Sequence, residues 1–191
     1  MKFINTYKSP NYNNRKKNSK IKFLIIHYTA LKNDLEAINY MCDHKNKVSS
    51  HYLINKKGEI YCLVNENLRA WHAGVSFWKR TKDINSYSIG IEMDDSGYHH
   101  NFENYTSSQT NSLINLLIFL KKKYEIKFDN ILGHSDIAPY RKIDPGEKFP
   151  WKKLKNKSII NNFHKIKKED IKNIEYIFKK KLFKSKKQKV L

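Results

Sequence analysis

The sequence predicts an α/β fold of the α+β type, in which a mixed central β-sheet carries helices packed on it and a C-terminal helical tail follows. Short apolar runs of strand length alternate with separate amphipathic segments in the order β-α-β-β-β-α-β. Hydrophobic residues make up 39% and aromatic residues 13% of the chain, which is enough for a substantial core. After residue 154 the composition shifts to Lys, Ile, Asn and Phe, which marks an added segment.

At 191 residues the chain has the length of one domain with room for an extra piece. Residues 1–20 are polar and rich in Asn, so we expect an extended N-terminal arm. Residues 21–154 form the predicted domain, and residues 155–191 form a basic C-terminal extension. Apolar residues at helical spacing predict a helix in this extension. They are Ile171, Ile174, Ile177 and Phe178.

The first half of the domain contains one helix among strands. Residues 21–28, IKFLIIHY, are nearly all apolar, which is typical of a buried strand. Residues 33–44 begin with Asn-Asp and predict a helix. Its expected apolar stripe comprises Leu35, Ile38 and Cys42. Residues 49–64 are two β-prone runs around Asn-Lys-Lys-Gly, a hairpin pattern, and residues 67–74 predict a loop with bulky aromatics.

The second half repeats the alternation of strand and helix. Residues 86–93 predict a strand, and residues 111–124 predict the longest helix. Its apolar stripe comprises Leu113, Leu116, Leu117 and Leu120. Thr106 and Gln109 have the spacing of a capping box before that helix. Residues 129–139 predict a strand that ends in a loop.

The formal net charge of +20 comes from 38 Lys and Arg against 18 Asp and Glu. This excess suggests an acidic partner, such as nucleic acid, anionic lipid or anionic cell wall. Abundant Lys, Asn and Ile with few Gly and Pro would also follow from A/T-rich codons. Because the Lys residues are spread widely, we favour compositional bias and expect no specific nucleic-acid partner. A steep salt dependence of DNA binding would be the signature of the other alternative.

The two cysteines, Cys42 and Cys62, fit neither a metal-binding pattern nor a disulfide framework, so we expect reduced thiols. The N-terminus has no apolar run of signal-peptide length. No segment has the roughly 18 apolar residues that a membrane span needs. A cytoplasmic protein, monomeric by default, is the expectation.

Three polar side chains stand where predicted strands end. His27 ends the run FLIIH, His134 follows ILG, and Asp144 precedes Pro-Gly. Two His and one carboxylate are a standard ligand set for a catalytic zinc with an open fourth position. Each residue alone is weak evidence, because a His at a strand end is more often structural and Asp-Pro-Gly is more often a plain turn.

Two further charged residues need an explanation. Glu92 lies in the apolar strand IGIEM, where a carboxylate is costly to bury, unless it simply faces outward. Lys142 lies two residues before Asp144 in RKIDPGEKFPW, so both side chains point to one face of an extended segment. They form either an exposed salt bridge or a metal ligand beside a group that neutralises an oxyanion.

Together, six segments resemble the type 2 N-acetylmuramoyl-L-alanine amidases, zinc enzymes related to peptidoglycan recognition proteins. The segments are IIHYTA (25–30), VSSHYLI (48–54), RAWHAG (69–74), NSYSIGIE (85–92), GHSDIAP (133–139) and RKIDPGEKFPW (141–151). They occur in the family's order and at its spacing, and the resemblance covers about residues 8–154. PNYNNR (10–15) resembles the arm of one bacterial branch.

The resemblance implies one zinc ion per chain, bound by His27, His134 and Asp144, so that residues 21–154 are a zinc amidase domain. It implies that Glu92 acts on the attacking water and that Lys142 stabilises the transition state. The implied reaction is hydrolysis of the amide bond between N-acetylmuramic acid and L-alanine in peptidoglycan or muropeptides. The alternative is a non-catalytic peptidoglycan-binding module.

The chain departs from phage-lysozyme-type relatives at two positions. Ser50 stands where those relatives carry a catalytic Tyr, and Asp144 stands where they often carry Cys. Both differences match the bacterial subgroup that relies on Glu and Lys. Trp71 and His72 are candidate substrate-binding residues, with a packed aromatic and a structural His as the alternatives. Asp136 is expected to orient the loop after His134.

Overall fold

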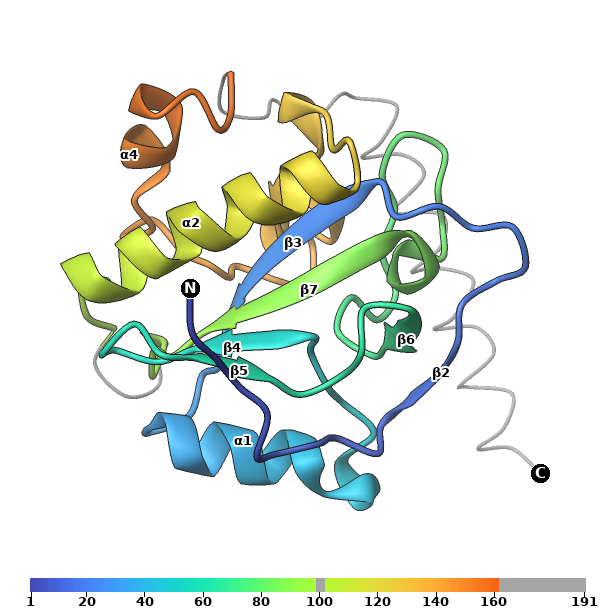
Figure 1. Ribbon diagram of the computed structural model, residues 1–191, viewed down its shortest axis with the longest axis horizontal. Helices are drawn as coiled ribbons and strands as arrows, with labels where there is room; N and C mark the ends of the chain where they lie inside the picture. Colours follow the sequence, from blue (N-terminus) through green and yellow to red (C-terminus); the bar gives the residue numbers. More distant parts are fainter. Residues whose placement is uncertain (99–101, 162–191) are drawn as a thin grey trace.

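The computed structural model describes residues 1–98 and 102–161, and a six-stranded mixed sheet lies at its centre (Figure 1). The strand order is β1-β5-β4-β7-β3-β8. The strands are β1 (Phe3–Ile4), β3 (Phe23–Tyr28), β4 (Tyr52–Ile54), β5 (Ile60–Cys62), β7 (Ser88–Met93) and β8 (Ile131–Gly133). A separate antiparallel pair joins β2 (Tyr12–Asn14) to β6 (Leu68–Ala70). The predicted α/β class with a mixed sheet is confirmed.

Helices cover both faces of this sheet. The α-helices are α1 (Asp34–Cys42), α2 (Ser107–Lys123), α3 (His134–Ile137) and α4 (Trp151–Asn156). Short 3-10 turns are η1 (His44–Asn46), η2 (Ile84–Tyr87) and η4 (Phe128–Asn130). In Figure 1, α2 and α1 lie on opposite sides of the strands. The two faces of the sheet are therefore covered by different helices.

Strand β3 lies between β7 and β8 in the sheet and pairs in parallel with both. Its side chains alternate between two cores. Leu24 and Ile26 pack in the cluster that contains α2, whereas Phe23 and Ile25 pack in the cluster on the other face. A strand buried on both faces needs apolar residues at every position, which explains the continuous apolar run before His27.

The predicted stripe of α1 is partly wrong. The helix buries Ala37, Ile38 and Met41, while Leu35 is 51% exposed. The small Ala37 faces the sheet, and this rotates Leu35 into solvent; sequence spacing supports either stripe. Asn33 caps the helix, since its side chain accepts the Glu36 N–H.

Helix α2 begins earlier than predicted, directly after its N-cap Thr106. The Thr106 hydroxyl accepts the Gln109 N–H at 3.1 Å, as the capping-box pattern predicts. The Gln109 amide, however, donates to the Ile54 and Asp94 carbonyls instead of returning to Thr106. This residue therefore ties the helix to the ends of β4 and β7.

Two elements appear where loops were expected. Strand β6 lies inside the predicted loop 67–74 and pairs with β2 of the arm, and α3 replaces the loop after β8. The pairing of β2 with β6 joins segments far apart in the sequence, so periodicity within either segment does not reveal it. The first helical turn of α3 is closed by Asp136, whose carboxylate accepts the Gly133 N–H at 2.7 Å.

The packed core extends past the boundary expected at residue 154. Leu154, Ile159 and Ile160 are buried in the same cluster as α2. The predicted helix with Ile171 lies outside the described residues. Within the described part of the chain, no helix has both the length and the apolar character that crossing a membrane requires.

Replacing Ile159, which is 1% exposed, tests this extended core. We expect Ile159→Ala to lower the free energy of unfolding by about 2–4 kcal/mol, because it opens a cavity among packed side chains. The matched control is Ile118→Ala on α2, where the side chain is 50% exposed and the expected loss is below about 1 kcal/mol. Urea denaturation measures both, and equal losses would remove Ile159 from the core.

Candidate metal centre

Strand register places two of the candidate residues side by side. In the parallel pairing of β3 with β7, His27 is opposite Glu92. The other face of β7 packs in the α2 cluster through Ile89, Ile91 and Met93. By alternation, Ser88, Gly90 and Glu92 therefore face the same side as His27. The polar residues of these two neighbouring strands therefore share one face of the sheet.

The three predicted ligands converge on one point. The Nδ1 atoms of His27 and His134 are 2.9 Å apart. The Asp144 Oδ2 atom lies 3.1 Å from the first Nδ1 and 3.0 Å from the second. All three side chains are buried, and among the described residues this is the group of His, Cys, Asp or Glu that can hold a metal ion.

The donor set fits a metal ion. Burial, with a contribution from His27, lowers the pKa of His134 to about 4, so this imidazole is neutral at pH 7. Burial opposes ionisation of Asp144, but its close contacts with the His134 and His27 imidazoles lower its pKa below the usual range. Three lone-pair atoms so close together repel one another unless a positive charge lies between them. Two imidazole nitrogens and one carboxylate oxygen are ligands that Zn²⁺ accepts.

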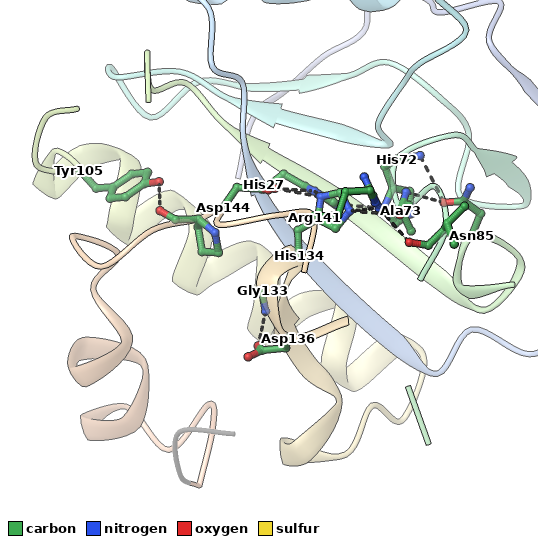
Figure 2. A network of polar contacts seen from close by, with 12 residues as sticks. His27, His72, Ala73, Asn85, Tyr105, Gly133, His134, Asp136, Arg141 and Asp144 are labelled. Atoms are coloured by element: carbon green, nitrogen blue, oxygen red, sulfur yellow. Dashed lines mark hydrogen bonds and ion pairs between the residues drawn. The ribbon is translucent and has the colours of Figure 1, made fainter. Parts of the chain in front are cut away.

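Contacts behind the ligands hold them in place (Figure 2). The His134 Nε2 atom lies 3.1 Å from the Ala73 carbonyl oxygen. The His27 Nε2 atom lies 3.0 Å from His72 Nδ1. The backbone around Asp144 is held by the Ser135 N–H, which donates to the Asp144 carbonyl at 2.9 Å.

A cavity of about 510 Å³ opens beside the three ligands and is walled on one side by α1. Glu92 and Lys142 line it. The Glu92 Oε2 atom is buried and has no hydrogen-bond partner among the described residues. Burial raises the pKa of Glu92 to about 7, and the nearby Asp144 adds to the increase, while His27 and Lys142 oppose it. The group can therefore both take up and release a proton near neutral pH.

The structure does not contain the salt bridge between Lys142 and Asp144 that was one of the two alternatives. The Lys142 ammonium forms no ion pair with Asp144, whose Oδ2 atom contacts His27 and His134 instead. Both Lys142 and Asp144 nevertheless line the same cavity. A positive side chain that forms no ion pair with the other described residues therefore lines the same cavity as the candidate ligands.

Comparison with known proteins identifies the family. The model of the N-acetylmuramoyl-L-alanine amidase family matches residues 17–147. The chain belongs to this amidase family. Its amidase relatives include AmiD of Escherichia coli (strain K12), 40% identical over 152 residues that cover 73% of this chain and 54% of AmiD. They also include the 1,6-anhydro-N-acetylmuramyl-L-alanine amidase AmpD of Haemophilus influenzae, 36% identical over 163 residues that cover 76% of this chain and 86% of AmpD.

Solved amidase structures share the fold. AmiD from E. coli, in complex with the substrate anhydro-N-acetylmuramic acid-L-Ala-D-gamma-Glu-L-Lys, superposes with a TM-score of 0.69 at 36% identity. That match covers 76% of this chain and 61% of AmiD. AMPDH3 from Pseudomonas aeruginosa, in complex with anhydromuramic pentapeptide, superposes with a TM-score of 0.67 at 35% identity, covering 81% and 67%. This chain thus spans about half the length of AmiD and most of AmpD.

The two candidate substrate-binding residues of this amidase-family chain, Trp71 and His72, differ in their position relative to the cavity. Trp71 does not line the cavity, and its indole N–H donates to Asn13 of β2 at 2.9 Å. His72 lines the cavity but is only 6% exposed and lies against His27. Ser50 is fully buried, and its hydroxyl has no hydrogen-bond partner among the described residues.

Sequence reasoning missed residues that support the candidate ligands through hydrogen bonds. Ala73 acts through its carbonyl, and a backbone atom leaves no signal in residue type. Arg15 of the arm donates to the carbonyls of Glu66, Asn85 and Ser88 at 2.9–3.0 Å. The motif PNYNNR ends in this Arg, and the family resemblance was the available signal for it.

The raised pKa of Glu92 predicts a stability effect in the metal-free protein. The folded-state pKa of about 7 exceeds the ordinary 4.5, so the carboxyl's contribution is complete below pH 4.5 and is lost as the pH rises through about 7. Glu92→Gln is neutral throughout this range. We expect it to match the parent near pH 4.5 and to be more stable by on the order of 3 kcal/mol at pH 8. Denaturation across this range measures the difference, and a pH-independent difference would contradict the raised pKa.

Proposed function

We propose that this chain is a zinc-dependent hydrolase that cleaves the amide bond between N-acetylmuramic acid and the L-alanine of a muropeptide. The observation that carries the proposal is the convergence of His27, His134 and Asp144 within 3.1 Å, beside the Glu92 Oε2 atom, which has no hydrogen-bond partner in the described part of the chain. The family and the names of the amidase relatives supply the bond. A binding module would need no proton-transfer group in the same cavity.

The anhydro form of the muropeptide is the substrate class that we propose. AmpD is named for a 1,6-anhydro sugar, and AmiD and AMPDH3 were solved with anhydro-muramic peptides. The cavity of about 510 Å³ has the size of a small-molecule site. Such soluble fragments suit the predicted cytoplasmic location, which itself stays a prediction.

Zinc is the metal that we propose for the three donors. His27, His134 and Asp144 would hold it, leaving a coordination position open. When bound, zinc polarises a scissile carbonyl and lowers the pKa of water towards neutral. Zinc accepts mixed nitrogen and oxygen donors, whereas Mg²⁺ and Ca²⁺ prefer oxygen ligands alone.

Glu92 moves the proton in this proposal. Its buried Oε2 atom has no hydrogen-bond partner within residues 1–98 and 102–161, so it can accept a proton from the attacking water. The same carboxyl then donates that proton to the departing nitrogen of L-alanine. Positive charge placed among the donors lowers the pKa of Glu92 from about 7, which keeps the base ionised at neutral pH.

Lys142 stabilises the oxyanion in this proposal. Its ammonium lines the cavity and makes no ion pair or hydrogen bond with the described residues. Negative charge develops on the carbonyl oxygen as the water attacks. A positive charge already directed at this space stabilises that oxygen more in the transition state than in the substrate.

Mass spectrometry of products tests the proposal. The zinc-loaded protein should release the peptide from anhydro-N-acetylmuramic acid-L-Ala-D-γ-Glu-L-Lys by adding one water. Glu92→Gln should keep its zinc and lose about two to four decades of turnover, the usual effect of removing a general base. Asp144→Ala should lose the zinc, because one of three protein ligands is gone. A parent protein that binds the muropeptide and never cleaves it would instead be the binding module.

The role of Lys142 is tested by its removal. Lys142→Ala should fold, bind zinc normally and lose about two to three decades of kcat, the effect of deleting one oxyanion donor. Lys142→Arg should recover only part, because a planar guanidinium does not replace a compact ammonium. The control is Lys57→Ala in the exposed hairpin turn, which should leave kcat unchanged. Turnover of Lys142→Ala within a few-fold of the parent, at full zinc content, would exclude the oxyanion role.

A further inference from the structure

We propose that His72 fixes the tautomer of His27 and that Ala73 fixes the tautomer of His134. Asn85 is the positioning residue that holds His72 and Ala73 in place. The inference deepens the proposed function, since it rests on His27 and His134 serving as metal ligands through their Nδ1 atoms. An imidazole binds a metal through its unprotonated nitrogen, so the partner of the other nitrogen decides whether the site is ready.

For His134, a backbone carbonyl determines which ring nitrogen carries the proton. The His134 Nε2 atom lies 3.1 Å from the Ala73 oxygen, which can only accept. Arg141 Nη2 also lies 3.1 Å from this Nε2, but it donates to Ala73 and Val75 at 2.8 and 3.0 Å, which uses both of its hydrogens. His134 Nε2 is therefore the donor to Ala73, and its Nδ1 atom keeps the lone pair that faces His27 and Asp144.

For His27, a chain of hydrogen bonds through Ser88 and His72 also determines that Nε2 carries the proton. The Ser88 hydroxyl donates its hydrogen to the Ile84 carbonyl at 2.8 Å. Its oxygen, 3.0 Å from His72 Nε2, must then accept a hydrogen from that nitrogen. His72 Nδ1 is consequently unprotonated and accepts from His27 Nε2 at 3.0 Å. The lone pair of His27 is thereby placed on Nδ1, the atom that faces His134 and Asp144.

The partners of the two ligand imidazoles are consecutive residues, and one side chain holds both. The Asn85 Oδ1 atom accepts the backbone N–H of His72 at 3.2 Å and that of Ala73 at 2.8 Å (Figure 2). Asn85 is 6% exposed, so water does not replace these bonds. Displacing this pair of residues would shift the proton acceptors of both imidazoles together.

The surroundings leave His72 and Asn85 little freedom. A Cβ atom at Gly90 would lie 2.5 Å from the His72 ring, so the ring packs directly on the backbone of β7. Arg15 donates to the Asn85 carbonyl at 3.0 Å and to the Ser88 carbonyl at 2.9 Å. The arm thus fixes the segment that supplies both the Asn85 amide and the Ser88 hydroxyl.

Zinc affinity of Asn85→Ala, measured by competition with a chelating dye, tests the proposal. We expect the dissociation constant to rise about 10–100-fold, as when other groups that orient metal ligands are removed. Asn85→Asp keeps an acceptor oxygen and should recover most of the affinity. The control is Asn55→Ala, because Asn55 is 3% exposed and its Oδ1 accepts two backbone N–H groups at 2.9 and 3.1 Å in a distant hairpin turn. It should lose thermal stability and keep the parent's zinc affinity.

Ring-nitrogen NMR of the zinc-free protein is the second readout, and it needs no metal. In the parent, His27 and His134 should both be Nε2–H tautomers. Ser88→Ala should give mixed tautomers at His27 and leave His134 unchanged, which keeps the test open if Asn85→Ala does not fold. Nδ1–H tautomers in the parent, or parental zinc affinity in Asn85→Ala, would overturn the inference. A parent that shows the expected tautomers and binds no zinc would contradict the proposed function instead.

Discussion

The parallel pairing of β3 with β7 and β8 is the constraint on which the site depends. The pairing places His27 opposite Glu92. It also aligns β8 beside β3, so that His134, the first residue of α3, follows directly at the end of β8. Because side chains alternate along each strand, the same register that buries Ile26 and Ile91 against α2 leaves the polar residues on the opposite face. A shift of one residue in β7 would exchange Glu92 for an apolar neighbour and bury its carboxylate in the α2 core.

Burial shifts the pKa values of the ionisable groups near these strands in opposite directions. It raises the pKa of Glu92 and lowers that of His134, so one carboxyl tends towards its neutral form while an imidazole gives up its proton. Asp144 stays ionised because two imidazoles contact it. A cavity that combines a proton acceptor near neutral pH, an ionised carboxylate and the neutral His134 imidazole suits hydrolysis.

Support for the site comes from segments that are distant in the chain. Arg15 of the arm, Asn85 before β7 and the loop residues His72 and Ala73 form a continuous set of hydrogen bonds behind the candidate ligands. The strand pair β2–β6 brings the arm to this position, and the Trp71 indole bonds to Asn13 there. The N-terminal arm is therefore part of the structure that positions the loop after β6.

The sequence by itself determined the mixed sheet, the five strands that follow the arm in it, and the candidate residues His27, Glu92, His134, Lys142 and Asp144, because periodicity and residue type can be read along the chain. The tertiary structure decided the exposure of Leu35, the existence of β6 and the position of His72 behind His27. It also decided that Ala73 and Asn85 belong to the site. These outcomes depend on backbone atoms and on pairings between distant segments, and residue type at a single position carries no record of either.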